Sequence, residues 1–459
     1  MKIAAIHEKI YVHFTNLNKT IYQNLLAQIQ QKENFQNALL LVAALISGLV
    51  AVAYAKIFKL AEHLFLSSIA ENKQIVFIMT PLLFLVAWWV VHQFSKESSG
   101  SGIPQVLAAN EFDDEGQHKK QISRFLSFKI IFFKSLSSII SVIGGGAIGR
   151  EGPTIHICAS IFYIVGEKVK RYLPSSRSHL WIISGASAGL AAAFNTPLGG
   201  IIYAIEELGA THFSKIRTIL LAAIITSGLI SLWLSGNYLY LGFPVVTIEG
   251  ISIIPMAILV GVISGLAGSS FSSLLFTLSS LRRKIKDPKK LALITLFCGF
   301  AMATLIYVDS RSSGSGLDLL NEFLFHGKTA DGYLVLSRFF GTMISYLSGS
   351  AGGIFSPALT IGGSLGGYIA KLFASPDQNI IILLGMIGFL TGVTKTPFTS
   401  FILVVEMTNK HSAIFPMMVT ALVALLASNI IHGHSFYERV KELYLEEIKT
   451  EKITKPKME

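Results

Sequence analysis

The stretch Gly149-Arg150-Glu151-Gly152-Pro153 lies inside an apolar run, 125–210, that glycine and proline interrupt repeatedly. The helices between such interruptions are expected to be too short to cross a bilayer core of about 30 Å. Non-helical backbone at membrane depth survives only where protein buries it or where it lines a water-filled cavity. A second interrupted run, 340–407, carries Gly352-Gly353-Ile354-Phe355-Ser356-Pro357. We therefore expect both breaks to line a site within the membrane.

The composition of the chain agrees with a membrane protein. Of its 459 residues, 52% are hydrophobic and only 14% are charged, against roughly 25% charged residues in soluble domains. Several segments are long and apolar enough to cross a bilayer; they are 38–57, 75–94, 216–234, 251–280 and 412–431. The sequence predicts an all-α, polytopic protein with one membrane domain, 37–440, in contact with the lipid bilayer.

The net charge of +11 does not indicate nucleic-acid binding, because the basic residues are gathered in short loops between apolar spans. These residues include Lys168, Lys170 and Arg171, the run from Arg282 to Lys290, and the tail lysines Lys449, Lys452, Lys455 and Lys457. The positive-inside rule predicts that these loops and the C-terminal tail, 441–459, are cytoplasmic, and we place the N-terminal segment, 1–36, on the same side. No apolar core precedes Asn37, so we expect no cleaved signal peptide. Cys158 and Cys298 lie in apolar segments, which argues against a disulfide framework or a cysteine metal site.

The chain contains an internal repeat, which we place at about 37–240 and 250–440. Residues 98–102, Ser-Ser-Gly-Ser-Gly, recur at 312–316, and the spacing of Gly149 to Pro153 recurs in Gly353 to Pro357. A third series recurs at a constant offset of 200 residues and pairs Gly185, Leu190, Thr196, Pro197, Ile202 and Glu206 with Gly385, Leu390, Thr396, Pro397, Ile402 and Glu406. Duplication with broken helices at corresponding places is typical of secondary transporters that bind substrate near the membrane midplane.

The two helix breaks have the chemical features of an anion-binding site. Each supplies the N-terminus of a half-helix, where unpaired amides and the positive end of the helix dipole attract anions. Pro153 and Pro357 suit the first helical turn, where the missing N–H would be unpaired anyway. Gly353-Ile354-Phe355 offers amides without an acidic side chain nearby. This pattern predicts a site for a small anion held by neutral donors.

Three motifs in order resemble the signatures of the CLC family of chloride channels and transporters. They are Gly100-Ser101-Gly102-Ile103-Pro104, Gly149-Arg150-Glu151-Gly152-Pro153 and Gly353-Ile354-Phe355-Ser356-Pro357. The resemblance covers about 38–440 and implies a homodimer in which each subunit has its own anion pathway between two inverted repeats. It also implies that Ser101 and Tyr437 donate hydroxyl groups to chloride, that the amides of Ile354 and Phe355 complete the site, and that Glu151 is the external gate.

Two glutamates decide the mechanism. Glu151 is an ionisable residue at membrane depth, which indicates function, although adjacent Arg150 could instead hold it as an inert pair. Its carboxylate can occupy an anion site and leave it on protonation. Glu207 has no acidic partner in the repeat, where Met407 stands. By the resemblance, Glu207 matches the internal proton-transfer glutamate of the CLC exchangers, where channels usually have an apolar residue.

The sequence therefore predicts secondary active exchange of chloride for protons, with no cofactor and no metal. A passive chloride channel of the same fold is the alternative. An intramembrane enzyme using Glu151 and a histidine is disfavoured because no nucleophile and base stand together. By the resemblance, a fluoride exporter is disfavoured, because the fluoride branches typically depart from serine at the position of Ser101. The resemblance further implies a bacterial inner-membrane protein, and the short 441–459 tail predicts no CBS modules.

Four other polar groups are ambiguous. Lys134 could raise the positive potential of the pathway or extend to an interface. His156 is expected to be a satisfied polar group, and His432 and His434 lack a third metal ligand. Glu206 is expected to have a structural role at a helix end that reaches water.

Overall fold

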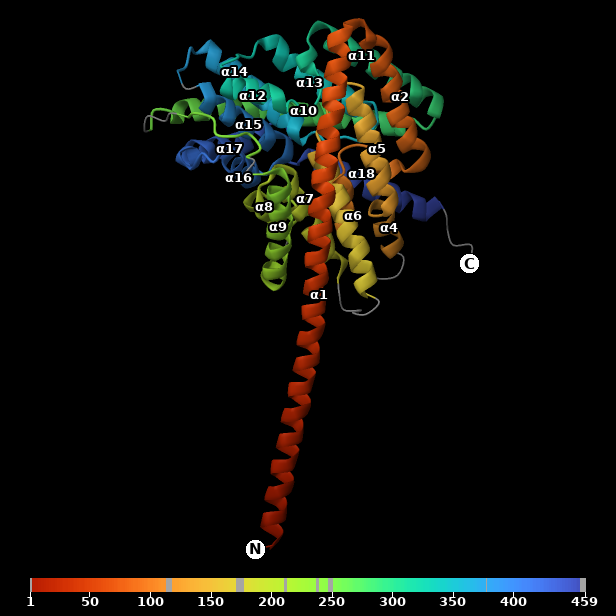
Figure 1. Ribbon diagram of the computed structural model, residues 1–459, viewed down its shortest axis with the longest axis vertical. Coiled ribbons are helices and arrows are strands. Elements are labelled where there is room, and N and C mark those ends of the chain that lie inside the picture. Colours follow the sequence, from red (N-terminus) through yellow and green to blue (C-terminus); the bar gives the residue numbers. More distant parts are fainter. Residues whose placement is uncertain are drawn as a thin grey trace.

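The computed structural model describes residues 2–112, 118–170, 177–209, 213–236, 239–246, 251–376 and 378–454, which form an all-helical fold (Figure 1). The helices of the first half are α1 (Lys2–Glu71), α2 (Val76–Phe94), α3 (Ile103–Asn110), α4 (His118–Phe125), α5 (Phe128–Ile143), α6 (Glu151–Lys170), α7 (Ser178–Phe194), α8 (Pro197–Glu206) and α9 (Phe213–Ser235). Those of the second half are α10 (Ile254–Lys284), α11 (Pro288–Val308), α12 (Leu317–Phe325), α13 (Gly332–Leu347), α14 (Phe355–Leu372), α15 (Gln378–Thr394), α16 (Pro397–Thr408), α17 (Ile414–Asn429) and α18 (Phe436–Thr454).

Helices of the two halves correspond in order and in how they begin. α3 and α12 both follow a Gly-Ser-Gly segment whose last glycine, Gly102 or Gly316, has a left-handed backbone. α8 and α16 both begin with proline after a threonine, Thr196 or Thr396. α18 has no counterpart in this order and packs against α3 and α10. The duplicated sequence therefore gives a duplicated series of helices.

Six helical segments in the described part of the chain are long and apolar enough to cross a membrane. They are Asn34–Glu71, Lys73–Phe94, Lys119–Ile143, Ile254–Lys284, Pro288–Val308 and His411–Asn429. The sequence prediction omitted the span at 288–308 and assigned 125–143 to an interrupted run. It was also wrong that every piece within the interrupted runs is short, because α6 has 20 residues and α14 has 18.

The buried centre is made by helices that are apolar on every side. α7 and α15 bury nearly all their residues, as α6 and α14 do over most of their length. α14 and α15 approach closely because Gly362 and Gly385 face each other, and a Cβ on either would meet the backbone of the other helix. Such small-residue contacts are the usual means of close helix packing in membranes. The glycines thus let α14 pack closely against α15 in the buried centre of the bundle.

The outer helices expose apolar side chains. Exposed examples are Leu60 and Leu64 on α1, Ile78 on α2, and Leu293 and Phe297 on α11. Such surfaces suit contact with lipid rather than water. α1 continues well beyond the bundle toward the N-terminus (Figure 1). Arg171, Lys455 and Lys457, three of the predicted cytoplasmic basic residues, lie outside the described residues.

Candidate anion site

Backbone hydrogen bonds join the three motifs. Gly149 and Gly353 form an antiparallel bridge in which each amide donates to the other's carbonyl at 2.8 Å. Gly100 and Ala351 form a parallel bridge, with the Gly100 amide donating to Ser350 at 2.9 Å and the Gly352 amide donating to Gly100 at 3.1 Å. Motifs separated by up to about 250 residues therefore meet at one place, between the starts of α3, α6 and α14.

Four polar groups around this junction are buried. The side chains of Ser101 and Tyr437 are 1% and 0% exposed, and their hydroxyls have no hydrogen-bond partner among the described residues. Ile354 and Phe355 are equally buried at the start of α14, where the first amides of a helix have no partner within the helix. Burying a polar group without a partner is costly, so these donors are expected to serve a ligand.

Ser101 is fixed by its contact with Gly152. A Cβ added to Gly152 would lie 2.8 Å from the Ser101 carbonyl oxygen and 3.3 Å from the Gly353 Cα, and it would also overlap the Ser101 hydroxyl. Only glycine lets the starts of α3, α6 and α14 approach this closely. Gly152 thus brings the Ser101 hydroxyl next to the helix ends that carry the amides.

Lys134 on α5 holds the loop that carries Ser101. Its ammonium is fully buried and donates to the Ser98 carbonyl at 3.0 Å and to the Gly100 carbonyl at 3.1 Å. The ammonium therefore does not extend to an interface. In the other half, buried Arg338 on α13 donates to the carbonyls of residues 311–314, including Ser313 at 2.6 Å. Each half therefore uses one buried cation to hold the loop before its short helix.

Glu151 is the first residue of α6, and its side chain is fully buried. Its Oε1 accepts a hydrogen bond from Tyr240 Oη at 2.9 Å and lies 3.8 Å from Arg150 Nε. Its Oε2 has no partner among the described residues and lies against Gly149, where a Cβ would clash with it. The carboxylate therefore lies between the starts of α6 and α14, and its hydrogen bond from Tyr240 is shorter than its contact with Arg150.

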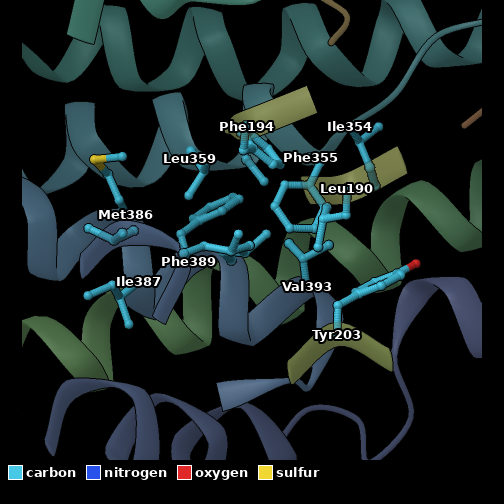
Figure 2. Close-up of a cluster of buried hydrophobic side chains, with 14 of the residues drawn as sticks. Leu190, Phe194, Tyr203, Ile354, Phe355, Leu359, Met386, Ile387, Phe389 and Val393 are labelled. Carbon is cyan, nitrogen blue, oxygen red and sulfur yellow. The ribbon is translucent and has the colours of Figure 1, made fainter. Parts of the chain in front are cut away.

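Tyr240 contacts the candidate gate residue Glu151, and the sequence analysis did not single it out. It lies in the connection 239–246, where no periodicity or motif indicated a role. Its ring packs edge-on against Phe194 with centroids 4.9 Å apart, and Phe194 in turn contacts Phe355. Figure 2 shows Phe194, Phe355, Leu190 and Val393 together in the apolar cluster beside the site.

Glu207 follows α8 and is only partly buried. Its amide donates to the Tyr203 carbonyl at 3.0 Å. Tyr203 and Tyr437 are both buried, and neither hydroxyl has a hydrogen-bond partner among the described residues. In Figure 2, Tyr203 lies at the edge of the apolar cluster with its hydroxyl directed away from Val393. A buried hydroxyl without a hydrogen-bond partner among the described residues, that of Tyr203, therefore lies one helical turn before Glu207.

The remaining sequence candidates do not add to the site. His156 is fully buried, and its Nε2 lies 2.8 Å from the Phe125 carbonyl. Exposed His434 pairs with Glu438 at 3.1 Å. Within the described ranges, no three His, Cys, Asp or Glu side chains are grouped so that they could hold a metal ion.

A comparison with protein families matches residues 83–429 to the family described as voltage gated chloride channel. The chain belongs to this CLC family. The resemblance drawn from the three motifs is thereby confirmed, and the protein is a CLC anion transporter rather than an enzyme.

Relatives of the CLC protein include the H⁺/Cl⁻ exchange transporter ClcA of Vibrio cholerae serotype O1, strain M66-2. It is 28% identical over 378 residues, which cover 79% of this chain and 78% of the relative. ClcA of Salmonella paratyphi A is 26% identical over 441 residues, which cover 90% of each chain.

Solved CLC structures share the fold. A slow cyanobacterial Cl⁻/H⁺ antiporter matches with a TM-score of 0.75 and 24% identity over 90% of this chain and 98% of its own. A CLC-type fluoride/proton antiporter matches with a TM-score of 0.73 and 22% identity over 88% of this chain and 96% of its own. These likenesses confirm the predicted all-helical, polytopic membrane fold.

Proposed function

We propose that this CLC protein exchanges chloride for protons across the bacterial inner membrane, with Glu151 as the external gate and Glu207 as the internal proton-transfer residue. The observation that carries the proposal is that buried, neutral donors without partners lie at the same backbone junction as the Glu151 carboxylate. The Ser101 and Tyr437 hydroxyls and the amides at the start of α14 lie in one buried region, next to a titratable anion on the same backbone junction. The names of the ClcA relatives agree with this exchange.

In the proposed mechanism, the Glu151 carboxylate and chloride compete for the same hydrogen-bond donors. An ionised Glu151 carboxylate and a chloride ion are both anions, and both are stabilised by amides at a helix N-terminus. When Glu151 takes up a proton, it loses this attraction and leaves room for chloride. Each cycle of the side chain then links one protonation to anion movement. Coupling requires that protons reach Glu151 from the opposite side, which is the role we assign to Glu207.

Ser101 favours chloride over fluoride, because by the family resemblance the fluoride branches typically depart from serine at this position. Glu207 favours exchange over passive conduction, by the same resemblance. A fluoride/proton antiporter is nevertheless among the proteins with a similar fold. Both anions therefore belong in the test.

The proposal includes a homodimer with cytoplasmic termini. α9 and α17 expose large apolar side chains, among them Leu229 at 56% and Leu426 at 70%. A second copy of the chain would cover these faces, since a two-fold dimer is the commonest arrangement of soluble homo-oligomers. Measurement of the protein mass in detergent by light scattering tests this part. A monomeric mass for the unmodified protein would contradict it.

The test of the exchange is proton movement in proteoliposomes under an imposed chloride gradient, with a protonophore control. We expect chloride to drive protons uphill in the unmodified protein. Glu151→Ala and Glu207→Ala should each abolish proton movement while chloride still moves. Chloride flux without proton flux in the unmodified protein would instead identify a passive channel. Uphill proton movement driven by fluoride and not by chloride would identify the fluoride alternative.

A further inference from the structure

Tyr240 reaches the gate from outside the signature motifs. Its segment, 239–246, connects the two halves and is pinned by the Leu241 amide, which donates to the Met407 carbonyl at 3.1 Å. The Tyr240 side chain is 3% exposed. This backbone anchor and the ring contact with Phe194 hold the phenol in one orientation, directed at α6.

The phenol hydroxyl lies between two polar partners. It donates to Glu151 Oε1 at 2.9 Å and lies 3.1 Å from Ser356 Oγ, on the first turn of α14. The guanidinium of Arg150 lies 5.7 Å from the centroid of the Tyr240 ring. Tyr240 therefore touches the carboxylate more closely than the neighbouring cation does, since Arg150 Nε is 3.8 Å from Oε1.

We propose that Tyr240 is a positioning residue for the gate: its hydroxyl, supported by Ser356, holds the ionised Glu151 carboxylate in place and sets the pH at which the gate opens. The proposal rests on the proposed role of Glu151. A donor hydrogen bond stabilises a carboxylate more than the protonated acid. When the protonated side chain leaves, the Tyr240 and Ser356 hydroxyls lose an acceptor in a buried region, which favours the return of the carboxylate or the entry of an anion.

The groups that interact with Glu151 or with its hydrogen-bond partner Tyr240 come from the residue before α6, from α1, α14 and α18, and from the connection 239–246. Arg150 precedes Glu151, Tyr54 projects from α1 and Tyr437 from α18, and Ser356 and Tyr240 come from α14 and the connection. Of these groups, only Arg150 carries a charge near neutral pH. A change in the pH response after loss of the Tyr240 hydroxyl is therefore attributable to one neutral hydrogen bond.

The test is the pH dependence of chloride flux in proteoliposomes for Tyr240→Phe, which keeps the ring and removes the hydroxyl. We expect the midpoint of activation by acid to move to higher pH by about one unit, because one hydrogen bond to a charged group is lost. The matched control is Tyr163→Phe on the same helix as Glu151, whose hydroxyl lies 3.0 Å from Ser123 Oγ. The control should keep the midpoint of the unmodified protein.

A double variant separates positioning from simple loss of structure. In a Glu151→Gln background the gate cannot ionise, so adding Tyr240→Phe should leave the flat pH profile unchanged. A Tyr240→Phe midpoint equal to that of Tyr163→Phe would overturn the inference. If Tyr240→Phe does not fold, Ser356→Ala tests the same hydrogen-bond chain and should shift the midpoint in the same direction. A Glu151→Gln protein that keeps the normal pH response would overturn the proposed gate itself, which is a distinguishable result.

Discussion

Glu206 and Glu406 cap each other's helices. The Glu406 carboxylate accepts hydrogen bonds from two amides at the start of α8, at 3.1 and 2.9 Å. The Glu206 carboxylate accepts from two amides at the start of α16, at 3.1 and 2.6 Å, and from the Thr399 hydroxyl at 2.7 Å. Glu206 is the last residue of α8, and Glu406 lies in the last turn of α16. Because each caps the N-terminus of the other helix, α8 and α16 run antiparallel and are related by an approximate two-fold axis. Glu206 therefore does not simply mark a helix end in water.

Loss of either cap should lower stability. We expect Glu406→Ala to reduce the free energy of unfolding by about 1 kcal/mol, the usual cost of a lost N-terminal cap. Glu206→Ala should cost more, because it also leaves the Thr399 hydroxyl without its acceptor. Thermal unfolding in detergent measures both changes. Exposed Glu71→Ala is the control, and equal unfolding temperatures for all three variants would contradict the capping account.

Removing the Tyr437 hydroxyl should weaken chloride binding. Tyr437→Phe keeps the buried ring, and a lost hydrogen bond to an anion lowers affinity by about tenfold or more. Isothermal titration of chloride into purified protein measures the effect. Tyr163→Phe, which removes a hydroxyl paired with Ser123 at 3.0 Å, is the matched control. Unchanged chloride affinity in Tyr437→Phe would remove this residue from the site.

A methyl group at Gly152 should disrupt the junction of the three motifs. In Gly152→Ala the new Cβ would meet Ser101 and the Gly353 backbone, so we expect chloride binding to be lost and the unfolding temperature to fall. Gly332→Ala is the control, because its Cβ would make only ordinary contacts with Tyr368 at 3.6 Å or more. Gly152→Ala protein that binds chloride normally would show that close approach of these helices is unnecessary.

Substitutions of Lys134 and Arg338 should differ in their effect on chloride affinity, although both side chains bind the carbonyls of a loop. Lys134→Met frees the Ser98 and Gly100 carbonyls, so both stability and chloride affinity are expected to fall. Arg338→Met frees the loop at 311–314 and should lower stability alone, because that loop contributes none of the proposed chloride ligands. Unfolding and chloride titration of both variants check this contrast. Reduced chloride affinity of similar size in both would contradict it.

The pairing of Asp309, in the loop after α11, with Arg311 should make the stability of the protein depend on pH. Partial burial acts to raise its pKa, but hydrogen bonds and charge from Arg311 at 2.7–3.0 Å outweigh this and lower the pKa of Asp309 below its ordinary value. A lowered pKa in the folded state means that the stabilisation is present at neutral pH and is lost as pH falls through the folded-state pKa. Asp309→Asn should therefore destabilise by up to about 1 kcal/mol near pH 7 and by less in acid. An equal loss at both pH values in urea unfolding would contradict this pairing.

The fold was predictable wherever physical constraints repeat along the chain. Glycine and proline at Gly149 to Pro153 and Gly353 to Pro357 mark the starts of α6 and α14, because few other residues permit a close approach and then begin a helix. The contributions of Tyr240 and Glu406 were not predictable, because each acts on a partner far away in the sequence. Nothing local distinguishes a tyrosine in a connection, or a glutamate at a helix end, until the tertiary structure supplies the partner.

The bridge between Gly149 and Gly353 also constrains how the protein is made. A ribosome that has completed the first half has placed the Gly149 amide and carbonyl in the chain, but their partners are synthesised only with the segment before α14. Unpaired backbone groups in hydrocarbon cost several kcal/mol each. The nascent first half therefore needs water, the insertion machinery or another protein around its break until the second half arrives. A message truncated between the halves yields a product that cannot complete its own interior, which makes it a ready substrate for membrane proteolysis.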